Sequence, residues 1–189
     1  MESALFCFSG GLWYGYPPVI KRIQLLLIVC LLPCLQAWAG PDWQVYFSPD
    51  GGGQAAIIAA LGQASNSVLV QAYSFTSEPI AKALIAAHKR GVEVSVILDK
   101  GQRSAKYSSA DFLAHAGIRT LIDEKHAIAH NKVMLIDGTI VITGSFNFTK
   151  AAESANAENL LVIRDPGLAG KYAANWTLHE AHSASYQGK

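Results

Sequence analysis

Four polar side chains between residues 130 and 147 have the chemistry that phosphoryl transfer needs. His130 carries an imidazole, which titrates near neutral pH and can act as a nucleophile or as a general acid and base. Lys132 can neutralise the non-bridging oxygens of a phosphate, and Ser145 and Asn147 can donate hydrogen bonds to it. Because no group of carboxylates is spaced for Mg²⁺, we expect protein side chains to supply the positive charge.

The same stretch predicts the hairpin that positions these groups. Two apolar, β-branched runs, Val133–Ile136 and Thr139–Thr143, are joined by Asp137-Gly138, which is typical of a type I′ turn. Such a turn is expected to give these pairs: Ile136 with Thr139, Lys132 with Thr143 and His130 with Ser145. Side chains alternate along a strand. One face at the open end of the hairpin is therefore expected to carry four groups: His130, Lys132, Ser145 and Asn147.

The spacing of the motif resembles a known signature. The pattern His130-x-Lys132-x₄-Asp137-x₆-Gly144-Ser145-x-Asn147 is similar to that of the phospholipase D superfamily. Glu158-Asn159, 28 residues after the histidine, resembles a downstream acidic element of the small bacterial endonucleases of the Nuc type. The resemblance runs from Val45 to about Trp176, which is nearly the whole region after residue 40.

This resemblance implies a metal-independent phosphodiesterase without a cofactor. It implies that His130 attacks the phosphorus and forms a phosphohistidine, while a second histidine protonates the leaving oxygen and then activates water. Lys132 and Asn147 would hold the phosphate, Ser145 would support it, and Glu158 would orient an imidazole.

Two further motif residues are interpreted as structural. Asp137 falls in the turn, on the face opposite to His130, and aspartates in turns commonly accept hydrogen bonds from the nearby backbone. Gly144 is interpreted as a support for the strand end. Read without the motif, Ser145 could be an ordinary strand-end hydroxyl and Glu158 an ordinary surface carboxylate.

The chain contains one such motif, although the implied chemistry needs two histidines. We therefore expect a homodimer in which His130 of each copy contributes to one composite site on the two-fold axis. The other histidines are assigned no role. His126 and His130 are four residues apart, but no third metal ligand is evident. The remaining four are expected on solvated helix faces: His88, His115, His179 and His182.

Strand-like and helix-like segments alternate along the chain after residue 40. Strands are expected at Val45–Phe47, Ser67–Tyr73, Glu93–Asp99, Ile118–Ile122 and Asn159–Ile163, besides the hairpin. Helices are expected at Gln54–Gln63, Glu78–Arg90, Ser108–Ala116 and Leu168–His182. This alternation predicts one α/β domain, with a mixed, largely parallel sheet flanked by helices.

The first 39 residues have the features of a secretory leader. Lys21-Arg22 precedes the 13-residue apolar run Ile23–Leu35, and Ala37-Trp38-Ala39 is typical of a cleavage site. The run is shorter than the roughly 20 residues of a membrane-spanning helix. We expect cleavage after Ala39, leaving residues 40–189 as a periplasmic or secreted domain without contact with the membrane. A retained leader would instead anchor the domain in the inner membrane.

The composition after residue 39 excludes a strongly basic nucleic-acid-binding protein. Loss of the leader changes 15 basic and 14 acidic residues to 13 of each, because Glu2, Lys21 and Arg22 are removed. All three cysteines lie in the leader, so no disulfide is expected in the domain. Three functions remain open: a non-specific endonuclease for DNA and possibly RNA, a membrane-anchored phospholipase, and a binding module without catalysis.

Overall fold

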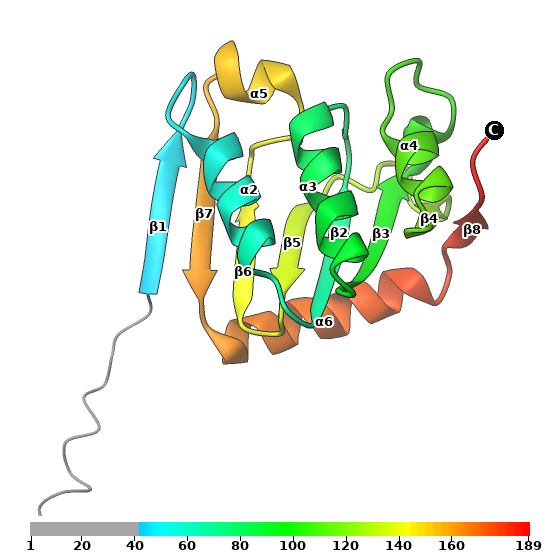
Figure 1. The fold of residues 1–189 in the computed structure, drawn as a ribbon. Helices are drawn as coiled ribbons and strands as arrows, with labels where there is room; N and C mark the ends of the chain where they lie inside the picture. The colour runs from blue at the N-terminus through cyan, green and yellow to red at the C-terminus, as the bar shows by residue number, and fades with distance from the viewer. Residues whose placement is uncertain (1–41) are drawn as a thin grey trace, which may run out of the picture. The chain divides into compact units, whose positions relative to one another are not determined.

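The computed structural model describes residues 42–189, which form a mixed sheet covered by helices (Figure 1). The described strands are β1 (Asp42–Phe47), β2 (Ser67–Ala72), β3 (Glu93–Asp99), β4 (Arg119–Asp123), β5 (Lys132–Ile136), β6 (Ile140–Gly144), β7 (Asn159–Arg164) and β8 (Ala184–Tyr186). They lie in the order β1-β7-β6-β5-β2-β3-β4-β8. The expected mixed sheet is confirmed.

The parallel part of the sheet is smaller than expected. Among the described strands, β2 pairs in parallel with β3 and β3 with β4, whereas the other five pairings are antiparallel. The expectation of a largely parallel sheet is therefore wrong. The β5–β6 connection, residues 137–139, is too short for a parallel crossover and forces these two strands to run in opposite directions. On the far side of β6, β7 also pairs with it in the antiparallel sense.

Helices cover both faces of the sheet. The described α-helices are α2 (Gly53–Gln63), α3 (Glu78–Lys89), α4 (Ala110–His115), α5 (Lys150–Ser154) and α6 (Pro166–Glu180), with a 3₁₀ turn η2 at Lys100–Arg103. Figure 1 shows α2, α3 and α4 in front of the sheet, α6 crossing behind it, and α5 at its upper edge. The sequence predicted β3 to the residue, and it missed the short elements α5 and β8.

The core has two layers because strand side chains alternate between the faces. On β5, Met134 and Ile136 join the larger core beneath α2 and α3, whereas Val133 and Leu135 join the smaller core beneath α6. Trp176 of α6 is buried in this second layer, and its Nε1 donates a 3.1 Å hydrogen bond to the carbonyl of a β2 residue. The sheet is thus fixed from both sides.

The β5–β6 hairpin differs from its predicted register by one residue. Asp137 and Gly138 both have positive φ, 52° and 63°, as a type I′ turn requires. However, Ile136 pairs with Ile140 and not with Thr139. Thr139 is an extra residue: its N–H donates to the Ile136 carbonyl, and its own carbonyl accepts a hydrogen bond from the N–H of Asp165, the residue before α6.

This shift changes the pairs near the open end. Thr143 pairs with Val133, so the expected pairings of Thr143 with Lys132 and of Ser145 with His130 are wrong. The physical reason is the bulge at Thr139, where two residues of one strand oppose one residue of the other.

The predicted leader, residues 1–39, and its cleavage after Ala39 lie outside the described residues. Within residues 42–189, every helix is too short or too polar to cross a membrane.

Candidate active site

The upper edge of the sheet is the edge at which α5 lies in Figure 1. Here β5 and β7 begin, at Lys132 and Asn159, and β6 ends at Gly144. Since these three neighbours are antiparallel, the start of one strand lies beside the end of the next. This topology brings the two halves of the motif to one place although 28 residues separate His130 from Glu158.

His130 and Lys132 are in direct contact at this edge. The Nζ of Lys132 lies 2.9 Å from Nδ1 and 3.0 Å from Nε2 of His130, and it donates a 2.7 Å hydrogen bond to the His130 carbonyl. The imidazole is exposed, whereas Lys132 is buried. A substrate can therefore reach the ring while the ammonium stays beside it.

Burial lowers the pKa of Lys132, and the charge of Glu158 opposes this change by raising it. The carboxylate thus acts on Lys132 from the far side of β6. The hydroxyl of Ser145 donates a 2.6 Å hydrogen bond to Oε2 of Glu158 and accepts one of 3.1 Å from the N–H of Asn159. Asn156 donates to the other carboxylate oxygen of Glu158 at 3.0 Å. Glu158 is consequently held in position.

Tyr73, just after β2, forms the third side of the site. Its ring lies 4.5 Å from that of His130 between centroids, with Lys132 Nζ 5.1 Å from the Tyr73 centroid. The N–H of Tyr73 donates to the carbonyl of Asn131 at 2.9 Å, which ties the segment before β5 to β2. Sequence reasoning left Tyr73 undecided between cleft and core; its place follows from the antiparallel pairing of β2 with β5.

Gly144 allows a close approach of β6 to β7. Its φ is +150°, and a Cβ at this position would lie 2.2 Å from the Asn159 carbonyl oxygen. That oxygen accepts hydrogen bonds from the N–H groups of both Ser145 and Phe146, at 3.1 and 3.2 Å, which is a β-bulge. The bulge changes the direction of the chain at Ser145, whose hydroxyl donates a hydrogen bond to Glu158.

Asn147 lies apart from these contacts. It is half-buried between the fully buried Phe146 and Phe148, and its Oδ1 is buried without a hydrogen-bond partner among the described residues. No contact joins its side chain to His130 or Lys132 within residues 42–189. The structure thus brings together four of the five expected site residues and places Asn147 as an unpaired amide beside them.

Asp137 lies at the opposite end of the hairpin. Its carboxylate accepts hydrogen bonds from the backbone N–H groups of Ser65, Asn66 and Ser67, at 2.8–3.0 Å, and from the Ser65 hydroxyl. Burial opposes ionisation, but these hydrogen bonds outweigh it and lower the pKa of Asp137. The side chain joins the turn to the start of β2.

Three histidines without an expected role gather elsewhere. His179 and His182, expected on a solvated helix face, point with His126 toward the buried carboxylate of Asp123. Burial opposes ionisation of Asp123, but the neighbouring imidazoles, of which His179 and His126 are hydrogen-bonded to it, hold its pKa well below the usual range. The sequence showed no third metal ligand beside His126 and His130. The structure groups His126 with Asp123, His179 and His182, and 56 residues separate Asp123 from His179. The only sequence signal was the spacing of His179 and His182.

Comparisons with known proteins identify the family of this chain. The family model described as "Cardiolipin synthase, PLD-like domain" matches residues 57–177. A phospholipase D of Rickettsia typhi is 43% identical over 138 residues, which are 73% of this chain and 68% of that protein. A mitochondrial cardiolipin hydrolase of Xenopus laevis is 35% identical over 109 residues, covering 58% of this chain and 52% of that protein.

A solved structure is similar along its whole length. The phospholipase D family member Nuc from Salmonella typhimurium superimposes with a TM-score of 0.76 and 38% identity, covering 79% of this chain and 100% of that one. The family match, the curated relatives and this fold agree. The chain belongs to the phospholipase D superfamily and is a hydrolase that acts on phosphodiester bonds.

Proposed function

We propose that this phosphodiesterase is a metal-independent endonuclease that cleaves DNA, and possibly RNA, with little sequence preference. The observation that carries the proposal is the exposed imidazole of His130 with the Lys132 ammonium at its edge. In this arrangement Lys132 supplies the charge that a metal ion supplies in other phosphodiesterases.

The proposed reaction has two displacements. In the first, a ring nitrogen of His130 forms a bond to phosphorus, the bond from phosphorus to the leaving oxygen breaks, and a second imidazole protonates that oxygen. In the second, this imidazole takes a proton from water, the water oxygen bonds to phosphorus, and the P–N bond breaks. Lys132 neutralises the non-bridging oxygens, and Ser145 and Glu158 hold the edge in shape. Asn147, whose Oδ1 is unpaired, holds the phosphate through its amide N–H groups.

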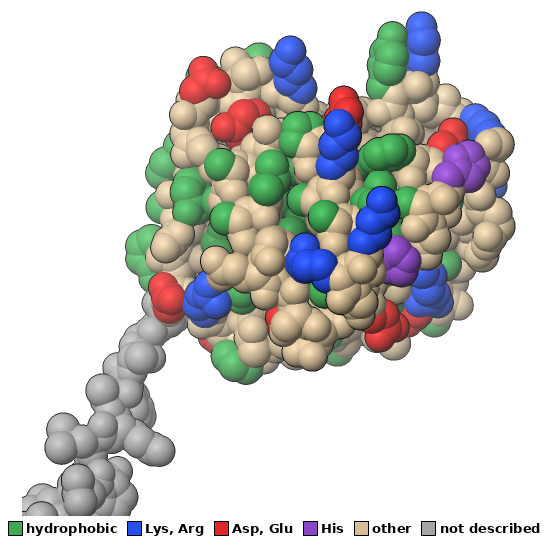
Figure 2. Space-filling view, viewed as in Figure 1, with side chains coloured by type: hydrophobic (Ala, Val, Ile, Leu, Met, Phe, Trp, Pro, Cys, Tyr) green, Lys and Arg blue, Asp and Glu red, His purple; other side chains and the backbone are tan. Residues whose placement is uncertain are grey.

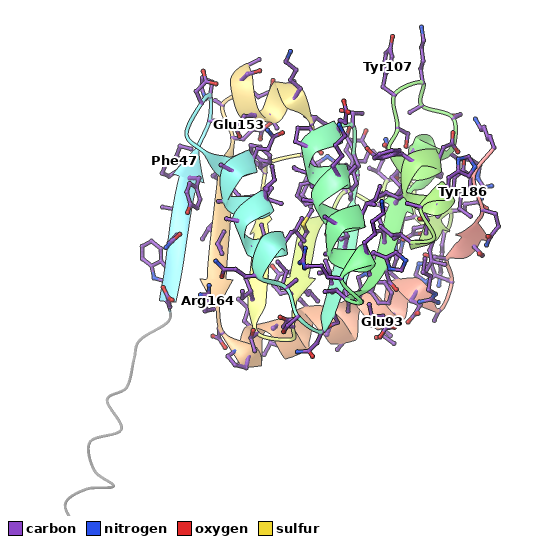
Figure 3. All side chains as sticks on the ribbon, in the orientation of Figure 1. Phe47, Glu93, Tyr107, Glu153, Arg164 and Tyr186 are labelled. Carbon is purple, nitrogen blue, oxygen red and sulfur yellow. The ribbon has the colours of Figure 1, made fainter. Side chains whose placement is uncertain are left out.

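A second copy of the chain supplies the second imidazole in this proposal. All six histidines fall within the described residues. Three of the others surround Asp123. His88 lines a pocket together with Glu93, and Figure 3 shows Glu93 at the lower edge of the sheet. His115 is the last residue of α4. None of these five contacts Lys132, so a two-fold dimer with a composite site completes the pair.

Nucleic acid is the favoured substrate because of the motif's resemblance to Nuc-type endonucleases and because of an exposed aromatic ring and a cation at the same edge of the sheet. Figure 3 shows Tyr107 projecting above the upper edge on the loop between η2 and α4. Its side chain is 73% exposed, and Lys106 Nζ lies 5.3 Å from its ring centroid. An exposed aromatic ring next to a cation suits a base and its phosphate. Figure 2 shows acidic and basic side chains interspersed on the α2–α3 face, so this face has no broad basic patch. Such a distribution suits a few local contacts with the phosphate backbone of a nucleic acid.

A phospholipid is the second candidate substrate. The relatives from Rickettsia and Xenopus are named phospholipase D and cardiolipin hydrolase, and both names refer to lipid diesters. With a retained leader the domain would lie at the membrane. With cleavage after Ala39 it would be periplasmic or secreted, and the N-terminus of the purified protein would be Gly40. N-terminal sequencing separates these two forms.

One assay tests the proposed activity. Plasmid DNA, phosphatidylcholine and cardiolipin are each incubated with wild type and with His130→Ala in the presence of EDTA, and circular dichroism follows folding in the same samples. Cleavage of DNA by folded wild type but not by the variant supports the nuclease. Lipid turnover without DNA cleavage would favour the phospholipase, and DNA binding with no turnover by either protein would indicate a binding module.

A further inference from the structure

Three imidazoles surround one buried carboxylate at the end of β4. Asp123, the last residue of β4, is fully buried, and His126 follows in the next turn. His179 lies in the last turn of α6, and His182 lies just beyond it. The Oδ2 of Asp123 is 2.9 Å from His126 Nδ1, 2.8 Å from His179 Nδ1 and 3.3 Å from His182 Nε2.

The surrounding backbone fixes the direction of these groups. The other oxygen of Asp123, Oδ1, accepts hydrogen bonds from the N–H groups of Lys125 and His126, at 3.1 and 3.4 Å, and lies 3.1 Å from Nδ1 of His126. Oδ2 faces the two rings at the end of α6 and lies 2.9 Å from the same Nδ1. The three rings form a triangle with centroid separations of 4.8, 5.1 and 5.4 Å. The four donor atoms, one from each residue, all lie within 4.8 Å of one another.

Hydrogen bonding alone leaves this cluster incomplete. A carboxylate oxygen has two lone pairs, whereas three ring nitrogens approach Oδ2 of Asp123. His182 Nε2 is the nitrogen left over: it is buried, and residues 42–189 offer it no hydrogen-bond partner. A buried polar atom without a partner calls for an explanation. A cation among the four atoms would accept a lone pair from each and leave none of them unsatisfied.

We propose that Asp123, His126, His179 and His182 form a four-coordinate site for a divalent metal ion, for which Zn²⁺ is the favoured occupant. Imidazole and carboxylate ligands suit Zn²⁺ and hold it at about 2.0–2.2 Å, so a tetrahedral site places its donor atoms about 3.3 Å apart. The present spacing requires shifts of roughly 1 Å or less to reach that geometry. With four protein ligands the ion has no open position, so its role is structural.

The ion would connect the end of α6 to the segment that leads to His130. Residues 124–131 connect β4 to β5, and their described anchors lie nearby: Lys100 donates to the His126 carbonyl at 3.0 Å, and Ala129 N–H donates to Asp99 at 2.8 Å. Without the ion, α6 and this segment meet here through the Asp123 carboxylate and through the packing of the His126 ring against that of His179. The site therefore stabilises the fold around the catalytic edge and takes no part in the displacement itself.

The test measures metal binding directly. The untagged full chain is stripped with a chelator, dialysed and titrated with ZnCl₂, and bound zinc is counted by mass spectrometry. The proposal predicts one Zn²⁺ per chain. At a free concentration about 100 times the Kd, it also predicts that the midpoint of thermal unfolding rises by about 5 °C or more. Co²⁺ in the same site should give the visible absorption of a tetrahedral complex. Wild type that takes up no zinc, or an octahedral Co²⁺ spectrum, would overturn the proposal.

Variants separate this site from the proposed catalysis. His182→Gln should weaken zinc binding by roughly 100-fold or more, whereas the control His115→Gln, on exposed α4 surface, should bind as wild type does. If His182→Gln binds zinc normally, the ligand assignment is wrong. His130→Ala should lose activity and still bind one Zn²⁺, so failure of either proposal is visible without the other.

Discussion

Lys132 contacts His130 at both its backbone and its ring: its ammonium donates a 2.7 Å hydrogen bond to the His130 carbonyl and lies 2.9 Å from Nδ1 of the same residue. These contacts hold the Lys132 ammonium beside the His130 imidazole, the proposed nucleophile. Tyr73 packs against both groups. A phosphate that approaches the imidazole must meet the ammonium as well.

Removal of the Lys132 charge should cost most of the activity. For Lys132→Gln we expect kcat/KM toward a diester substrate to fall by about 10²–10³-fold, because a preorganised charge at the developing oxyanion is lost. Lys132→Arg should recover part of that loss. Steady-state kinetics measure both, and Lys171→Gln, on exposed surface of α6, is the matched control. Wild-type kinetics for Lys132→Gln would contradict the proposed role.

The alkaline limit of activity should depend on Glu158. Burial lowers the pKa of Lys132 and Glu158 raises it, so removing the carboxylate charge should lower this pKa further. Lys132 would then lose its proton at lower pH, and in Glu158→Gln the alkaline limb of the kcat/KM profile should move toward neutral pH. The profile is measured in parallel for both proteins. A limb that stays in place or moves to higher pH would refute the coupling.

Two glycines in the same hairpin should respond differently to alanine. At Gly144 a Cβ would collide with the Asn159 carbonyl, whereas at Gly138 it would meet open space and only the positive φ is unfavourable. We expect Gly144→Ala to destabilise the domain by about 3 kcal/mol or more and Gly138→Ala by about 1 kcal/mol. Urea denaturation measures both free energies of unfolding. Equal losses of unfolding free energy in the two variants would show that the close approach of β6 to β7 does not contribute to stability.

Asp137 should contribute to stability and not to the reaction. Its pKa is lowered in the folded chain, so its contribution is complete above the unfolded value of about 3.9 and is lost as the pH falls through the folded value. Asp137→Asn should cost about 1 kcal/mol near pH 7, and the difference from wild type should narrow below about pH 4. Asp50→Asn, another aspartate with positive φ, is the control. A large loss of kcat with unchanged stability would instead make Asp137 part of the chemistry.

The sequence alone predicted the regular elements and the motif, because both depend on short spacings. The boundaries of β3 agree to the residue, and the positive φ of Asp137 and Gly138 follows from their residue types. The hairpin register did not follow, because the bulge at Thr139 is joined by a hydrogen bond to Asp165, a residue distant in the sequence. The short strand β8 is stabilised only by pairing with β4, which no local pattern reveals.

Contacts between distant segments account for the rest. The expected common face of His130, Ser145 and Asn147 rested on unbroken alternation, which the bulge beside Gly144 interrupts. Glu158 reaches Ser145 because β6 and β7 are neighbours, and His179 reaches Asp123 because α6 crosses the sheet. Both contacts join residues that are too far apart in the sequence for a pattern of short spacings to reveal them.

The central claim is that two His130 rings, one from each copy, act on one phosphorus. Wild type and His130→Ala are mixed in varied proportions, exchanged to equilibrium through mild dissociation, and assayed at constant total chain concentration. A composite site predicts activity that follows the square of the wild-type fraction, about one quarter of full activity in an equal mixture. Activity proportional to the wild-type fraction, about one half in that mixture, would contradict the claim.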